Sequence, residues 1–87
     1  MNVETIEVKV LYFGAAAEIA EKREEVLNLP SGATAYTAFS HILTAYPKLK
    51  KRFENSLLLA VNQEYAFGGT KLKHADELAI IPPVSGG

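Results

Sequence analysis

Apolar and polar residues alternate along residues 6–13, near the start of the chain. The segment reads Ile6, Glu7, Val8, Lys9, Val10, Leu11, Tyr12, Phe13. A period of two is typical of a strand with one buried face, here the face of Ile6, Val8, Val10 and Tyr12. Leu11 and Phe13 share the opposite face with Glu7 and Lys9. We therefore expect this strand to end with apolar side chains on both faces.

The clearest helical pattern runs from Thr34 to Tyr46. Apolar residues recur there every three or four positions, at Ala35, Ala38, Phe39, Ile42, Leu43 and Tyr46. This spacing predicts an amphipathic helix. Thr34 is a suitable N-cap, and Pro47 cannot continue the helix. Beyond Pro47 we expect a turn that Leu49 and Phe53 tether to the core.

Shorter segments complete the pattern. We predict extended segments at residues 23–29, 57–61, 64–67 and 78–81, and a short helix or helical loop at residues 15–20. Asn62 and Gln63 form a tight turn between two of these strands. Four to five short strands and one main helix predict an α+β fold, a mixed sheet with the helix packed across one face.

The other face of this sheet is expected to carry an apolar patch. If the first and last strands are neighbours, Leu11, Phe13 and Ile81 lie together, with Tyr65 close by. Exposed apolar patches of this kind mark docking sites. The alternative is that the sheet curls and buries these side chains, or that each is exposed singly without consequence.

Composition excludes several classes of function. The 87 residues suit one small domain, and the formal net charge of −1 gives no general attraction to nucleic acid or membranes. The absence of cysteine excludes thiol catalysis, disulfides and cysteine metal sites, and it fits a reducing compartment. No apolar run is long enough for a signal or membrane segment, so we expect a cytoplasmic protein.

Candidate catalytic residues are isolated from one another. His41 and His74 are far apart in sequence and have no carboxylate or cysteine at the spacing of metal ligands. The basic cluster between Lys48 and Arg52 has no interleaved aromatic residues, and we interpret it as a solvated helix end. We therefore expect a protein that does not catalyse a reaction alone.

The last six residues are Pro82, Pro83, Val84, Ser85, Gly86 and Gly87. Prolines hold the backbone extended and glycines lack a Cβ, so this segment can enter a narrow gap. Fully extended, it would reach on the order of 20 Å. A carboxylate at its tip is a poor electrophile and needs activation. We interpret residues 82–87 as a functional tail; the alternative is a frayed chain end.

Three segments resemble the small subunit of molybdopterin synthase. They are residues 10–13 (VLYF), 60–65 (AVNQEY) and, most specifically, 76–87 (DELAIIPPVSGG). The resemblance implies a ubiquitin-like β-grasp domain at residues 1–81 and an extended tail at residues 82–87. It also implies a sulfur carrier in molybdenum cofactor biosynthesis, a subunit of a complex that is not catalytic alone.

The resemblance further implies the chemistry at the chain end. An E1-like activating enzyme consumes ATP to adenylate the Gly87 carboxylate, which then becomes a thiocarboxylate. Gly86, which has no side chain, leaves room for this chain end in a narrow site. Sulfur passes to cyclic pyranopterin monophosphate. No cofactor is implied to be bound permanently.

The implied partner of the tail is the large synthase subunit, in an assembly of two small and two large subunits. The tail residues Pro82, Pro83, Val84 and Ser85 would enter its active site. Family members use the positions of Phe13, Tyr65 and Ile81 for apolar contact with that subunit, and Leu11 belongs to the same predicted patch.

One departure from the family pattern and three alternative functions stay open. The family's turn before the last strand usually has glycine before an acidic pair, where this chain has Ala75 before Asp76 and Glu77. The same terminus could serve a sulfur carrier for thiamin synthesis or transfer-RNA thiolation. It could also serve a ubiquitin-like modifier that forms an isopeptide bond. The third alternative is an interaction module with an inert tail.

Overall fold

The computed structural model describes residues 4–53 and 55–83. Their elements in chain order are β1 (Thr5–Tyr12), α1 (Gly14–Ala20), β2 (Glu24–Pro30), α2 (Ala35–Ala45), α3 (Pro47–Phe53), β3 (Leu58–Val61), β4 (Glu64–Ala66) and β5 (Glu77–Ile81). Every strand expected from the sequence is present, with ends shifted by a residue or so. Phe13 and Phe67, which we expected to lie within strands, fall just beyond them.

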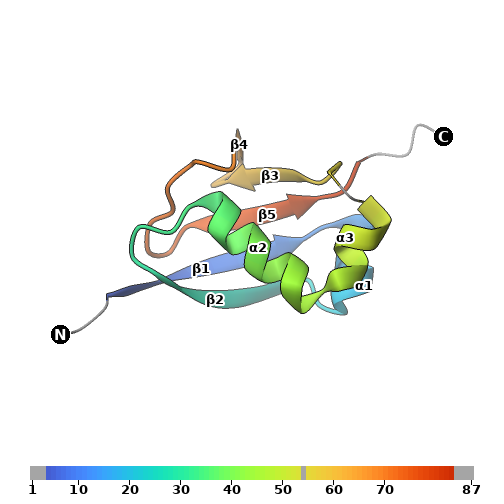
Figure 1. The fold of residues 1–87 in the computed structure, drawn as a ribbon, viewed down its shortest axis with the longest axis horizontal. Helices are drawn as coiled ribbons and strands as arrows, with labels where there is room; N and C mark the ends of the chain where they lie inside the picture. Colours follow the sequence, from blue (N-terminus) through green and yellow to red (C-terminus); the bar gives the residue numbers. More distant parts are fainter. Residues whose placement is uncertain (1–3, 54, 84–87) are drawn as a thin grey trace.

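The strands form one mixed sheet in the order β2-β1-β5-β3-β4. The first and last strands, β1 and β5, are neighbours and run parallel, whereas the other pairs are antiparallel. Figure 1 shows α2 lying across one face of this sheet, with α1 and α3 at the end where β5 finishes. This arrangement is the β-grasp fold, and it confirms the predicted α+β class.

Alternation along the central strands separates a buried face from an open one. The side chains that face α2 are the core of the domain, among them Val8 and Val10 of β1 and Leu78 and Ile80 of β5, all fully buried. The intervening residues of β1 and β5 are only partly buried or exposed. Within residues 4–53 and 55–83, no helix is long and apolar enough to span a bilayer.

Helix α2 begins as the sequence predicts. The Thr34 hydroxyl accepts a hydrogen bond from the Thr37 N–H, at 3.3 Å, and the Thr37 hydroxyl accepts one from the Thr34 N–H, at 3.2 Å. These bonds satisfy two backbone donors that the first turn of a helix leaves without partners. Thr34 is therefore confirmed as the N-cap.

The prediction of a turn after Pro47 is wrong, because residues 47–53 form the short helix α3. Proline is well suited to the first position of a helix, where its missing N–H would have no partner and its fixed φ is already helical. Leu49 is fully buried and Phe53 packs against the core, so the i, i+4 pair ties this helix to the domain.

The turn between β3 and β4 and the turn before β5 both use left-handed backbone. Asn62 and Gln63 have φ of 50° and 72°, the pair of positive values that a tight hairpin between β3 and β4 requires. Ala75 has φ of 75°, and its N–H donates to the Glu7 carbonyl at 2.7 Å. The position where the family usually has glycine thus keeps the glycine conformation although it carries a methyl group.

A polar cluster joins the end of α2 to the sheet. The hydroxyls of Tyr12 and Tyr46 both donate to the same Glu25 carboxylate oxygen. The two rings meet edge to face with centroids 5.8 Å apart, and the Lys22 ammonium lies 3.6 Å from the other oxygen of Glu25. Burial, reinforced by the hydrogen bond to Glu25, raises the pKa of Tyr12 above its usual value. The cluster holds β1, β2 and the last turn of α2 in fixed relation.

Candidate docking surface and tail root

A row of four residues crosses the open face of the sheet. The strand register places Leu11 of β1 beside Ala79 of β5, Ala79 beside Ala60 of β3, and Ala60 beside Tyr65 of β4. Side chains at paired positions point to the same face of a sheet. Two methyl groups therefore lie between two large side chains, and the open face is hollowed along β5 and β3.

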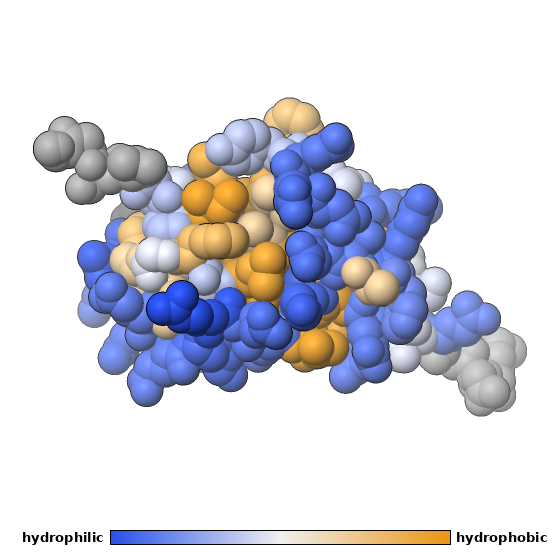
Figure 2. All heavy atoms as spheres, turned by 180° about the vertical axis from the view of Figure 1, so that it is seen from behind, coloured by the Kyte–Doolittle hydropathy of each residue, from blue (hydrophilic) through white to orange (hydrophobic). Residues whose placement is uncertain are grey.

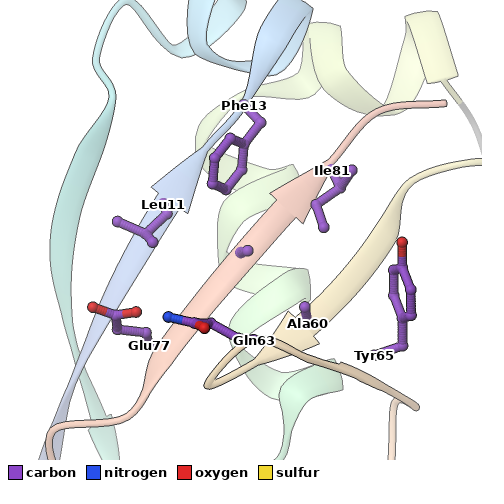
Figure 3. Close-up of a pocket in the computed structure, with 8 residues that line it drawn as sticks. Leu11, Phe13, Ala60, Gln63, Tyr65, Glu77 and Ile81 are labelled. Atoms are coloured by element: carbon purple, nitrogen blue, oxygen red, sulfur yellow. The ribbon is translucent and has the colours of Figure 1, made fainter. Parts of the chain in front are cut away.

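This hollow is an apolar groove of about 410 Å³, called the groove below. Its floor is Ala60 and Ala79. Its apolar walls are Leu11, Phe13, Tyr65 and Ile81, and its polar end is formed by Gln63 and Glu77. Figure 3 shows Leu11 of β1, Phe13 just after β1, Ile81 of β5 and Tyr65 of β4 around the floor. Phe13 is 47 % exposed and Tyr65 75 % exposed, so both have apolar surface left to bury.

The four patch residues expected from the sequence, Leu11, Phe13, Tyr65 and Ile81, are thus brought together. Figure 2 shows hydrophobic side chains gathered on this helix-free face of the molecule. Sequence reasoning missed the alanine floor, and it missed Leu58, which pairs with Ile81 and is 49 % exposed. The sequence did hold a signal for them, because Leu58 and Ala60 alternate with Leu59, and Ala79 lies between Leu78 and Ile80.

The polar end of the groove is held by hydrogen bonds between two turns. The Asn62 side-chain amide donates to the Asp76 carboxylate at 2.9 Å, and its oxygen accepts from the Glu77 N–H at 3.0 Å. Asp76 also accepts from the Lys73 N–H at 2.7 Å. These bonds fix the backbone from which Gln63 and Glu77 project, so the groove has a defined shape before any partner binds.

The root of the tail lies at the apolar end of the groove. The Phe13 N–H donates to the Ile80 carbonyl at 3.2 Å, which joins the end of β1 to β5 just before Pro82. Pro82 is partly buried and Pro83 is exposed. The other predicted tail residues, Val84, Ser85, Gly86 and Gly87, lie outside the described residues. Their roles, and the boundary of the tail at residue 82, stay predictions.

The two histidines lie in different elements of the described structure, His41 in α2 and His74 in the turn before β5. His41 is exposed on α2, and the His74 Nδ1 accepts a hydrogen bond from the Glu7 N–H at 3.1 Å. That bond gives His74 a structural role in the turn before β5. Among residues 4–53 and 55–83, no group of three or more His, Cys, Asp or Glu residues could hold a metal ion.

Comparison with known families assigns the chain. The sequence profile of the ThiS family matches residues 10–87, which include the groove and the tail. The chain belongs to the ThiS family. This ThiS-family chain is 43 % identical over 84 residues to the molybdopterin synthase sulfur carrier subunit of Caenorhabditis elegans, covering 94 % of this chain and 99 % of that protein.

The solved structures similar to this ThiS-family fold include the following two. The small archaeal modifier protein 1 of Haloferax volcanii superposes with a TM-score of 0.81 at 27 % identity, covering 91 % of this chain and 99 % of that one. A chain from the complex of subunits 1 and 2 of the molybdopterin-converting factor of Helicobacter pylori has a TM-score of 0.60 at 28 % identity. That match covers 94 % of this chain and all of the other, 100 %.

Proposed function

We propose that this chain is the sulfur carrier subunit of molybdopterin synthase and acts in molybdenum cofactor biosynthesis. The full-length similarity to a carrier subunit of that synthase supports the assignment. The observation that carries it is the preformed apolar groove, which opens beside the root of a segment ending in Gly86 and Gly87. A carrier needs a groove for docking and a thin tail for delivery. A carrier subunit does not catalyse a reaction without its partner subunit.

The chemistry of the carrier takes place at the Gly87 carboxylate. A carboxylate oxygen attacks the α-phosphorus of ATP, which releases pyrophosphate and forms an acyl adenylate. Hydrosulfide from a sulfur donor then attacks the carbonyl carbon and AMP leaves, which gives the thiocarboxylate and releases a proton. In this proposal ATP is consumed by a separate E1-like activating enzyme, and the carrier itself holds no permanent cofactor. Gly86 and Gly87 let the chain end pass where a Cβ would be rejected.

The partner that receives the sulfur carrier is the large subunit of the synthase. The similar Helicobacter pylori chain was solved in a complex of subunits 1 and 2 of the molybdopterin-converting factor, which supports a two-subunit assembly. We propose that Leu11, Phe13, Tyr65 and Ile81 contact that subunit while residues 82–87 enter its active site, where the acceptor is cyclic pyranopterin monophosphate. An assembly of two small and two large subunits, in the cytoplasm, completes the proposal.

Removal of Gly87 tests this function directly. The deletion is expected to abolish thiocarboxylate formation and sulfur transfer, and to leave the free energy of unfolding unchanged because β5 ends at Ile81. Intact-mass measurement after incubation with ATP, activating enzyme and a sulfur donor would show the oxygen-to-sulfur increase only in the full chain. A full chain that gains no sulfur under these conditions would refute the carrier role and leave an interaction module with an inert tail. A deletion variant that still gains sulfur would show that the chemistry does not take place at Gly87.

A second candidate is a ubiquitin-like modifier, because a modifier protein of Haloferax volcanii has the same fold at 27 % identity. Both functions start from the same acyl adenylate, but a modifier's carbonyl is attacked by a lysine amine of a target protein. Digestion of host proteins followed by mass spectrometry separates the two. Lysines that carry the glycine remnant of this tail identify a modifier, and a thiocarboxylate without such remnants identifies the carrier.

A further inference from the structure

A second cleft lies on the other side of the tail root from the groove. It has a volume of about 500 Å³, and its lining includes Phe13, Gly14, Arg52, Phe53, Ile81 and Pro82. Phe13 and Ile81 also line the groove, so the two hollows adjoin at the base of the tail. In Figure 1 the end of β5 passes α3, the helix that carries Arg52. A protein that contacts the tail root on the side of Arg52 would cover this cleft.

Among the described residues that line the cleft, Arg52 alone is charged. Its guanidinium carbon lies 5.4 Å from the centroid of the Phe53 ring, within the range of a cation–π contact. Phe53 is itself packed against the core. The ring therefore gives the guanidinium a preferred position on a fixed support, so less conformational entropy is lost when the group pairs with an anion.

The helix around Arg52 reinforces its charge. Lys48, Lys50, Lys51 and Arg52 lie within seven residues, and residues 47–53 contain no acidic residue. The whole chain has a net charge of −1, so this is a local positive region on a nearly neutral molecule. Basic residues in a last helical turn also interact favourably with the helix dipole. That effect explains a preference for basic residues on α3 and does not require one of them to line a cleft at the tail root.

We infer that the cleft receives a carboxylate side chain of the large synthase subunit, which forms an ion pair with Arg52 when the tail is inserted. The inference rests on the proposed function and adds a polar contact to the apolar docking described above. Apolar neighbours such as Phe13 and Pro82 would exclude water from the pair, which strengthens a charge-assisted hydrogen bond. A guanidinium also binds a carboxylate through two parallel hydrogen bonds, so the pair would fix the direction in which the tail leaves the domain.

Matched charge variants on α3 test the inference. Arg52→Gln and Lys48→Gln remove one positive charge each from exposed positions of the same helix, and Lys48 is not among the residues that line the cleft. We expect Arg52→Gln to raise the dissociation constant for the purified large subunit about 10-fold, as for a lost hydrogen bond to a charged group. Lys48→Gln should change it by about twofold or less. Titration calorimetry of the intact chains measures both.

A cross-linking experiment identifies the partner group. The chain with Arg52→Lys places an amine at the cleft, and a carbodiimide would join it to a carboxylate in direct contact. Peptide mass spectrometry should then find a bond between position 52 and an Asp or Glu of the large subunit. Equal weakening by Arg52→Gln and Lys48→Gln would mean that only general charge matters and would overturn the inference, as would unchanged affinity in Arg52→Gln. If the unsubstituted chain does not bind the large subunit at all, the proposed function fails and the inference fails with it.

Discussion

Truncation of Phe13 measures how much the groove contributes to docking. Phe13 is 47 % exposed in the isolated chain. A phenylalanine carries about 200 Å² of surface, so complete burial against a partner would remove about 95 Å² more from water. At about 25 cal/mol per Å², this burial is worth about 2.4 kcal/mol. Phe13→Ala is therefore expected to raise the dissociation constant for the large synthase subunit about 50-fold.

Val26 provides the matched control for this variant. It is 54 % exposed on β2 and pairs with Lys9, which places it on the same open face but outside the residues that line the groove. Val26→Ala should change the dissociation constant by less than about twofold. Titration calorimetry of both variants against the large subunit, with thermal unfolding to verify that each is folded, gives the comparison. Equal effects of the two truncations, or an unchanged affinity in Phe13→Ala, would refute docking through the groove.

Two further predictions concern stability. Ala75→Gly should raise the free energy of unfolding by about 0.5 to 1 kcal/mol, because the steric cost of φ at 75° that it removes exceeds the stability lost through the more flexible unfolded chain. Urea denaturation measures the gain, and a less stable Ala75→Gly variant would contradict the reasoning. In the control, Ala45→Gly at the end of α2 should instead destabilise the chain. Burial raises the pKa of Tyr12, so the folded chain holds this proton more tightly than the unfolded chain, and the stability it contributes is complete below about pH 10 and is lost as the pH rises above that value. Tyr12→Phe should therefore make the alkaline decline in the free energy of unfolding shallower, and an identical decline in both proteins would show that Tyr12 does not cause it.

Local sequence patterns were sufficient for most of the elements. The alternation from Ile6 to Tyr12 requires a strand because no helix could bury those four apolar side chains on one face. Helix α2 begins after Thr34 and ends before Pro47, because a hydroxyl can cap a helix and a proline cannot continue one. The helix after Pro47 was missed because proline was interpreted only as a stop, although Leu49 and Phe53 already had helical spacing.

The candidate site was only partly accessible from the sequence. The apolar character of Leu11 and Phe13 on a face otherwise marked as polar indicated an exposed patch, and the DELAIIPPVSGG ending indicated the tail chemistry. Neither pattern showed that Ala60 and Ala79 would form a floor, because alanine fits a buried and an exposed position equally well. The cleft at Arg52 was likewise invisible, since a basic run on a helix has the same sequence whether or not it lies beside the tail root.

The sequence by itself thus determined the strands, the main helix, the small-residue chain end and the family to which the chain belongs. Only the tertiary structure decided that Leu11, Ala79, Ala60 and Tyr65 stand in one row, because strand register depends on hydrogen bonds between segments far apart in the chain. It also decided that the groove and the Arg52 cleft meet at Phe13 and Ile81. The physical reason is that periodicity reports which face of an element is buried, whereas a site depends on which faces of different elements are packed side by side.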